Sequence, residues 1–191
     1  MNKYRVDKAW LWAVLGEWDK YVPKKVRLVA CGGTALTLQD LKESTKDIDF
    51  LIPDDDEYRT LILTLRKLGY KQVGGFKWAG SDGFTFDFFS GKQIFTTELL
   101  ESSLEEGNNI PIRQLKRIYV GALNDYDFII SKMFRGTAVD EEDCLRLIRA
   151  RGKELSLARL KERYLENAQY TLKPKDMEYN LESLLDKLGA G

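Results

Sequence analysis

Three aspartates stand where predicted strands would present their carboxylates to one face of a sheet. Asp47 and Asp49 flank Ile48, and Asp87 lies between Phe86 and Phe88 in a second alternating run. Side chains two residues apart on a strand point the same way, about 7 Å apart. Because carboxylate oxygens are the ligands that Mg²⁺ prefers, this pattern predicts a magnesium site.

A third carboxylate on a neighbouring strand changes the chemistry that such a site can do. Asp47, Asp49 and Asp87 together could hold two Mg²⁺ ions, with Mn²⁺ as an alternative, about 4 Å apart. Two ions so placed stabilise the attacking and leaving oxygens of an in-line displacement at phosphorus. We expect Asp87 to be a metal ligand and, in addition, the base that takes the proton of an attacking hydroxyl.

The segment Gly32-Gly33-Thr34 offers a complementary phosphate site. It follows the short apolar run at residues 27–31, which is typical of a buried strand that ends in a tight turn. Backbone N–H groups of Gly32 and Gly33 can approach phosphate oxygens because no Cβ stands in the way. Thr34 adds a hydroxyl donor, and its alternative role is to cap the helix that follows.

Composition removes most rival chemistries. The chain has no histidine, which excludes Ser-His-Asp hydrolases, His-ligated zinc sites and His general bases. Its 30 basic residues balance its 30 acidic ones, so net charge gives no argument for a nucleic-acid or membrane partner. Cys31 and Cys144 are too few and too separated for a disulfide framework or a zinc cluster.

The elements that must position these residues follow from hydrophobic periodicity and turn signals. The 191 residues are 43% hydrophobic, enough for a sizeable core. We expect helices at 5–20, 34–41, 54–68 and 98–106, and strands at 27–31, 47–52, 71–78, 84–89 and 117–123. Beyond residue 124 the pattern becomes helical, at 125–135, 140–151, 154–167 and 176–188. The prediction is an α+β fold, a mixed sheet flanked by helices (residues 1–123), with a helical region packed on it (residues 124–191).

Together these residues resemble the signature of the DNA polymerase β nucleotidyltransferase superfamily. That signature is a hydrophobic residue, Gly, then Gly or Ser, a spacer and an Asp-hydrophobic-Asp/Glu-hydrophobic run, with a third carboxylate downstream. Gly32-Gly33-Thr34, twelve further residues and Asp47-Ile48-Asp49-Phe50 follow it, except that Thr34 stands where many members have Ser. The resemblance implies a nucleotidyltransferase-type sheet and transfer of a nucleoside monophosphate from a nucleoside triphosphate, such as ATP, to a hydroxyl, with release of pyrophosphate.

The segment 127–143 is similar, more loosely, to the helix pair that follows the core in minimal bacterial and archaeal nucleotidyltransferases. These include the AbiEii and MenT toxin-type enzymes, in which a Lys at this position helps to bind the triphosphate. The resemblance implies that role for Lys132. Arg135 lies one helical turn away and could share it.

Several partners and two other functions stay open. The acceptor could be tRNA, a protein or a small molecule, and a toxin-type enzyme would have an antitoxin partner. Two basic stretches could follow a tRNA backbone, namely Arg113, Lys116 and Arg117, and Arg146, Arg149, Arg151 and Lys153. The alternatives are a non-catalytic binding or regulatory module and a metal-dependent glycosyltransferase. No apolar stretch approaches the roughly 20 residues that span a bilayer, so we expect a soluble cytoplasmic protein without a membrane partner.

Overall fold

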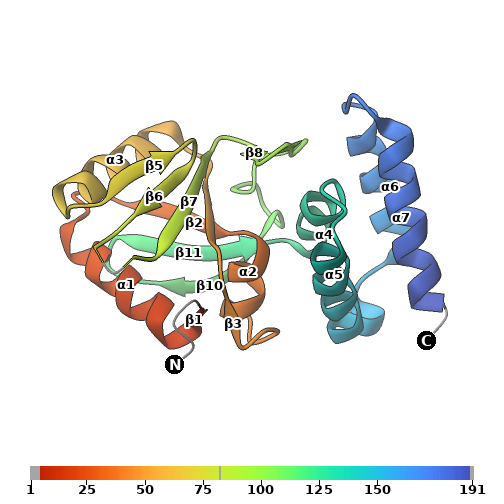
Figure 1. Ribbon diagram of the computed structural model, residues 1–191, viewed down its shortest axis with the longest axis horizontal. Coiled ribbons are helices and arrows are strands. Elements are labelled where there is room, and N and C mark those ends of the chain that lie inside the picture. The colour runs from red at the N-terminus through yellow and green to blue at the C-terminus, as the bar shows by residue number, and fades with distance from the viewer. Residues whose placement is uncertain (1–4, 82, 190–191) are drawn as a thin grey trace.

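The computed structural model, which describes residues 5–81 and 83–189, has the predicted α+β architecture (Figure 1). A seven-stranded mixed sheet has the order β10-β11-β2-β4-β7-β6-β5. Its strands, in chain order, are β2 (Val26–Ala30), β4 (Ile48–Ile52), β5 (Lys71–Gly74), β6 (Lys77–Ala79), β7 (Thr85–Ser90), β10 (Asn109–Gln114) and β11 (Ile118–Leu123). The helices are α1 (Lys8–Tyr21), α2 (Gly32–Leu38), α3 (Asp55–Lys67), α4 (Asp125–Met133), α5 (Ala138–Arg151), α6 (Leu157–Ala168) and α7 (Pro174–Gly189), with a 3₁₀ turn at Gly152–Glu154.

The central strands β4 and β7 run parallel and side by side, with Phe50 opposite Phe88. Phe50, Phe86 and Phe88 point to the face that is covered by α1, where Trp18 packs with ring centroids 5.0 Å from Phe86 and 5.8 Å from Phe88. Strict alternation then turns the polar residues of both strands to the opposite face. One face of the sheet is therefore an aromatic core, and the other presents the aspartates.

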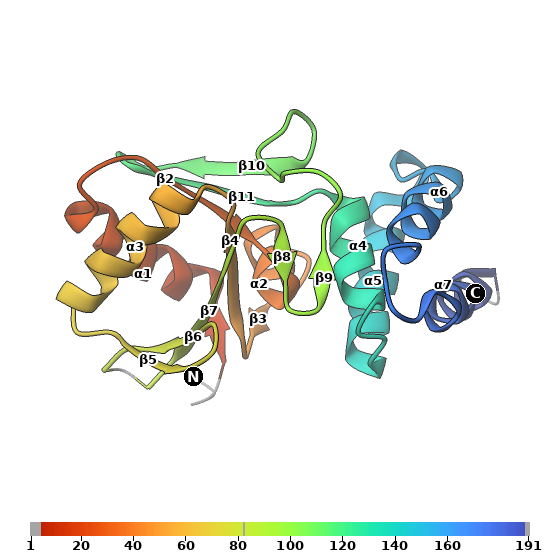
Figure 2. The ribbon, with the colours of Figure 1, turned by 90° about the horizontal axis from the view of Figure 1, so that it is seen from above.

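Two small antiparallel pairs complete the first part of the chain. β1 (Val6–Asp7) pairs with β3 (Ser44–Thr45), and β8 (Gln93–Ile94) pairs with β9 (Thr97–Glu98). The β8–β9 hairpin lies between the sheet and the C-terminal helices (Figure 2). At its tip Phe95 has a positive φ of 51° and packs on Phe89 of β7, with ring centroids 4.6 Å apart.

Three sequence predictions for the sheet region were wrong. The helix expected at 98–106 is absent, because β9 ends at Glu98 and the chain continues through turns in which the Asn108 side chain donates to Glu101 and to the Ser102 carbonyl. The single strand expected at 71–78 is two strands, β5 and β6, joined by a turn in which Gly75 has a φ of 39°. Strand β10 was not predicted, and half of it is exposed.

The C-terminal helices form a group beside the sheet, on the far side from α1 and α3 (Figures 1 and 2). Helix α4 begins directly after β11, with Asn124 as its N-cap, and packs against α5 and α6. Helix α2 contacts both β4 and the α4–α5 pair, so it joins the sheet to the helical group. No helix within the described residues is both long enough and apolar enough to cross a membrane.

Candidate active site

Asp49 and Asp87 are direct neighbours across the parallel pair of β4 and β7. They are only 4% and 7% exposed, and one oxygen of each, Asp49 Oδ1 and Asp87 Oδ1, is buried without a hydrogen-bond partner in the described structure. Burial first, and then the nearby Asp87 and Asp47 carboxylates, raise the pKa of Asp49 to about 7. Two such carboxylates side by side require a positive partner.

These two acids fit a divalent cation. Mg²⁺ is commonly held by one or two carboxylates, with water and substrate phosphate oxygens completing its coordination. The two unpartnered Oδ1 atoms are hard oxygen donors of this kind. Asp49 and Asp87 would therefore hold the ion that the nucleotidyltransferase resemblance implies.

The predicted cluster of three aspartates does not form. Within the described part of the chain, no group of three or more acidic, cysteine or histidine side chains is arranged to hold a metal ion. Asp47 is exposed and lies one residue before β4, in a bend. Strand alternation alone therefore does not align its side chain with Asp49, but Asp47 borders the same cavity and its charge helps to raise the pKa of Asp49.

The two glycines make room for side chains as well as for backbone. Gly32 is the first residue of α2 and has a φ of 51°. A Cβ on Gly32 would lie 2.7 Å from Asp49 Oδ2, and one on Gly33 would meet the Thr45 hydroxyl. Only Gly33 of the pair borders the cavity next to the aspartates. Gly32 is thus needed for the close approach of the Asp49 carboxylate to the helix start.

Thr34 does not cap α2. The N-cap is Cys31, which makes no capping bond with its side chain. The Thr34 hydroxyl is buried, donates to the Asp47 carbonyl (3.1 Å) and accepts from the Asp49 N–H (3.0 Å). Its observed contacts therefore tie the helix start to the beginning of β4 and hold the acidic segment in place.

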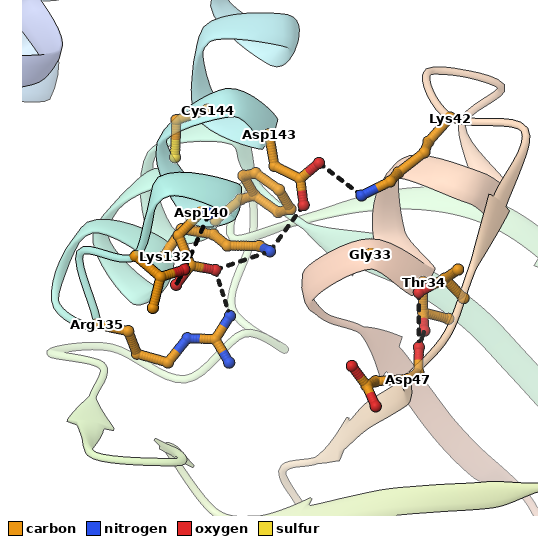
Figure 3. A network of polar contacts seen from close by, with 12 residues as sticks. Gly33, Thr34, Lys42, Asp47, Lys132, Arg135, Asp140, Asp143 and Cys144 are labelled. Carbon is orange, nitrogen blue, oxygen red and sulfur yellow. Dashed lines mark hydrogen bonds and ion pairs between the residues drawn. The ribbon is translucent and has the colours of Figure 1, made fainter. Parts of the chain in front are cut away.

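A cavity of about 450 Å³ lies between the aspartates and the C-terminal helices. Asp47, Asp49, Lys132 and Arg135 all border it, and Figure 3 shows Asp47 on the opposite side from Lys132 and Arg135. Three further basic residues that sequence reasoning missed also line it, namely Arg5, Lys42 and Lys46. Lys42 and Lys46 belong to the spacer between the glycines and the aspartates, so basic residues in that spacer were the available signal.

Lys132 is held by a buried network of charges. Its Nζ lies 3.0 Å from Asp140 Oδ1 and 2.8 Å from Asp143 Oδ2, and its side chain is 6% exposed. Arg135 contacts the same Asp140 oxygen at 2.6 Å, and Lys42 reaches from the sheet part to Asp143 Oδ1 at 2.7 Å (Figure 3). Asp140 and Asp143 therefore fix the positions of the cations that face the aspartates.

The basic stretches proposed for tRNA do not form one surface, and a second cavity is separate from the candidate site. The basic stretches proposed for tRNA are on different parts of the molecule, because Asp19 of α1 binds the backbone N–H of Arg117, whereas Arg151 belongs to α5 and pairs with Asp125. A second cavity, of about 700 Å³, lies between the β8–β9 hairpin and the α6–α7 segment. None of the predicted site residues lines it.

The site combines paired acids at the centre of a sheet, a helix that begins at a glycine and basic residues on the opposite wall. This combination is typical of nucleotidyltransferases. Residues 14–185 match the model of a family described as "Nucleotidyltransferase of unknown function (DUF6036)", and the chain belongs to this family. None of the curated proteins matches the chain. The protein is a nucleotidyltransferase, as the sequence resemblance predicted.

Two solved structures are similar in fold. The solution structure of the antibiotic-resistance factor ANT(2'')-Ia has a TM-score of 0.54 at 13% identity, over 96% of this chain and 93% of that one. The crystal structure of ANT(2'')-Ia in complex with adenylyl-2''-tobramycin has a TM-score of 0.46 at 14% identity, over 95% and 98% of the two chains. At this identity the first similarity establishes the fold.

Proposed function

We propose that this protein transfers a nucleoside monophosphate from a nucleoside triphosphate to a hydroxyl acceptor, in a reaction that depends on Mg²⁺ or Mn²⁺ and releases pyrophosphate. One observation carries the proposal: two buried carboxylates with unpartnered oxygens stand beside a cavity whose opposite wall is basic. That arrangement suits a substrate that brings a divalent cation together with several negative charges.

Each part of the site has a role in this reaction. Asp49 and Asp87 hold the cation, which when bound stabilises the charge that develops at the reacting phosphate. Lys132 and Arg135, with Lys42 and Lys46, bind the β- and γ-phosphates and favour the departure of pyrophosphate. Asp87 accepts the proton of the acceptor hydroxyl, whose oxygen forms the new bond to the α-phosphorus as the bond to the bridging oxygen breaks.

The acceptor is a hydroxyl of tRNA, of a protein or of a small molecule. A protein acceptor or tRNA would suit a cytoplasmic toxin-type enzyme with an antitoxin partner, whereas the adenylyl-2''-tobramycin bound to ANT(2'')-Ia is a small-molecule conjugate. These alternatives are distinguished by which acceptor pool becomes labelled. Growth arrest on expression, relieved by a neighbouring gene product, would support the toxin assignment.

The test is pyrophosphate release from each of the four nucleoside triphosphates with Mg²⁺, in the presence of pooled tRNA, pooled protein or small metabolites. We expect one triphosphate to be used, and we expect Asp49→Asn to lower the rate about a thousandfold or more, because the cation loses a charged ligand. Asp55→Asn is the matched control, since it removes the same charge from an exposed helix start.

Other outcomes select the alternatives. Binding of a nucleoside triphosphate without turnover in any pool would favour a non-catalytic binding module. Tighter binding of a nucleotide sugar than of the free triphosphate would favour a glycosyltransferase. Full activity of Asp49→Asn would contradict the proposed site.

A further inference from the structure

Three charged residues form one row across three adjacent strands of the sheet. Asp49 of β4 lies opposite Asp87 of β7, and Asp87 lies opposite Lys77 of β6. Lys77 Nζ is 3.2 Å from Asp87 Oδ2. Residues directly opposite on neighbouring strands are the closest side-chain neighbours in a sheet, so this order of charges is fixed by the strand register.

Strand alternation on β6 determines the face to which the Lys77 side chain points. Trp78, the next residue on β6, is 2% exposed and belongs to the core, so alternation turns Lys77 to the aspartate face. The pair differs from an ordinary surface ion pair, because the Asp87 side chain is only 9% exposed although that of Lys77 is 42% exposed. A charge pair with a desolvated partner is screened less by solvent than an exposed one.

The ion pair with Lys77 determines which carboxylate oxygens of Asp49 and Asp87 remain free. Lys77 occupies Asp87 Oδ2, whereas Asp87 Oδ1 and Asp49 Oδ1 have no partner among the described residues. One open oxygen on each acid suffices to bridge one divalent cation. A second cation on the outer side of Asp87 would meet the ammonium group of Lys77, and no third acid of the described chain joins the pair.

We propose that Lys77 is a built-in cation of the active site, which takes the place of a second metal ion beside Asp87. The inference rests on the proposed metal-dependent function and replaces the two ions expected from the sequence by one. Asp87 and Lys77 do not line the 450 Å³ cavity that Asp49 shares with the basic residues. Lys77 lies on the outer side of Asp87 in the sheet, where its positive charge neutralises one oxygen of that carboxylate.

The experiment measures Mn²⁺ binding to the purified full chain without nucleotide, by calorimetry and by the electron paramagnetic resonance signal of free Mn²⁺. The variants are Lys77→Met, which removes the charge, and Lys77→Arg, which keeps it. Lys71→Met is the matched control, because Lys71 on β5 is exposed and lies opposite Ala79. Only Mn²⁺ that is lost in Asp49→Asn is counted, so that binding elsewhere does not enter the comparison.

We expect the wild-type protein to bind one such Mn²⁺ and Lys77→Met to bind it at least about tenfold tighter and to accept a second ion, because a repelling charge is gone. Lys77→Arg and Lys71→Met should match the wild type within about threefold. Without metal, Lys77→Met should melt about 3 °C lower or more, because the two acids lose their internal counter-ion. Added Mn²⁺ should then raise its melting temperature by more than that of the wild type.

The two proposals fail in different ways. If Lys77→Met binds Mn²⁺ with the number and affinity of the wild type, or if the wild type already binds two ions, the role of Lys77 is refuted while the metal-dependent function stands. If no variant binds Mn²⁺ in a manner that depends on Asp49, the proposed function itself fails.

Discussion

Two buried charge clusters face each other across the candidate site, and they are neutralised in opposite ways. On the helical side, Lys132 has carboxylate partners at 3.0 and 2.8 Å in Asp140 and Asp143. On the sheet side, Asp49 and Asp87 are almost as buried, yet each keeps an unpartnered oxygen. The helical cluster has all its cations within the chain, whereas the acid pair has Lys77 on one Asp87 oxygen and keeps two open oxygens for a cation from outside.

The two clusters therefore have different roles: the helical cluster positions its side chains, and the acid pair is suited to bind a metal ion. A buried ion pair that is broken from one side leaves an uncompensated charge and destabilises the fold. A carboxylate without a partner in the metal-free protein instead destabilises it while it is charged. Removing Lys132 and neutralising Asp49 should therefore change stability in opposite directions.

The largest expected change in stability is from Lys132→Met. Asp140 and Asp143, each 3% exposed, would lose their shared cation and keep only Arg135 and Lys42, so the free energy of unfolding should fall by about 3 kcal/mol, the lower end for a broken buried pair. Urea denaturation measures the loss. Lys161→Met, which removes an exposed lysine from α6, should change it by less than about 0.5 kcal/mol. Equal effects of the two substitutions would contradict the structural role of the network.

The acid pair should give the protein an unusual dependence on pH. Asp49 has a folded pKa of about 7 against an ordinary value of 3.8, so the folded state binds more protons than the unfolded state between these values. Stability contributed by protonated Asp49 is therefore present below about pH 4 and is lost as pH rises toward 7.

Urea denaturation of the metal-free protein at several pH values measures this effect. Asn cannot ionise, so Asp49→Asn should remove this part of the pH dependence and be more stable than the wild type at pH 8. Saturating Mg²⁺ should also remove it, because the cation binds the charged carboxylate. A wild-type protein that is no less stable than Asp49→Asn at pH 8 would contradict the burial of an unpaired charge.

A smaller effect is expected from Gly32→Ala. The added Cβ would lie 2.7 Å from Asp49 Oδ2, and a φ of 51° disfavours any side chain, so we expect a loss of about 1–2 kcal/mol in stability and weaker Mn²⁺ binding. Gly16→Ala in α1 is the control, because its Cβ would meet nothing within 4 Å. It should be neutral or slightly stabilising. If Gly32→Ala behaves like Gly16→Ala, the close approach of Asp49 to the helix start is unimportant.

The smallest effect is expected from Lys46→Gln. Lys46 is exposed at the edge of the cavity, so its loss should raise KM for the triphosphate about threefold to fivefold and leave kcat and stability nearly unchanged. Steady-state kinetics measure both constants. A change in kcat with an unaltered KM would place Lys46 at the reacting phosphate instead.

The central strands and their acids were predictable because alternation acts within one strand. Ile48 to Ile52 and Thr85 to Ser90 carry their period in the sequence, and the structure confirms both strands. Which strands become neighbours depends on the whole fold, so the Asp87–Lys77 pair could not be found from the sequence. The role predicted for Asp47 stays a prediction, because Asp47 lies one residue before the strand and alternation alone does not place its side chain.

The region between β7 and β10 shows the limit of composition as a guide. Glu98, Glu101, Glu105 and Glu106 suggest a helix, but side-chain amides satisfy the carbonyls of turns instead, as Asn109 does for Ser103 at 2.7 Å. Lys132 lines the cavity, and its buried acidic partners lie on the next helix. Tertiary contacts of this kind leave no local pattern.

The most direct test of the proposed site is a crystal structure of the full chain with Mn²⁺ and a non-hydrolysable nucleoside triphosphate, with anomalous scattering used to locate manganese. We expect a manganese peak within coordination distance of Asp49 Oδ1 and Asp87 Oδ1, with the triphosphate extending toward Lys132 and Arg135. A nucleotide bound in the 700 Å³ cavity beside α7, or manganese bound away from both aspartates, would contradict it.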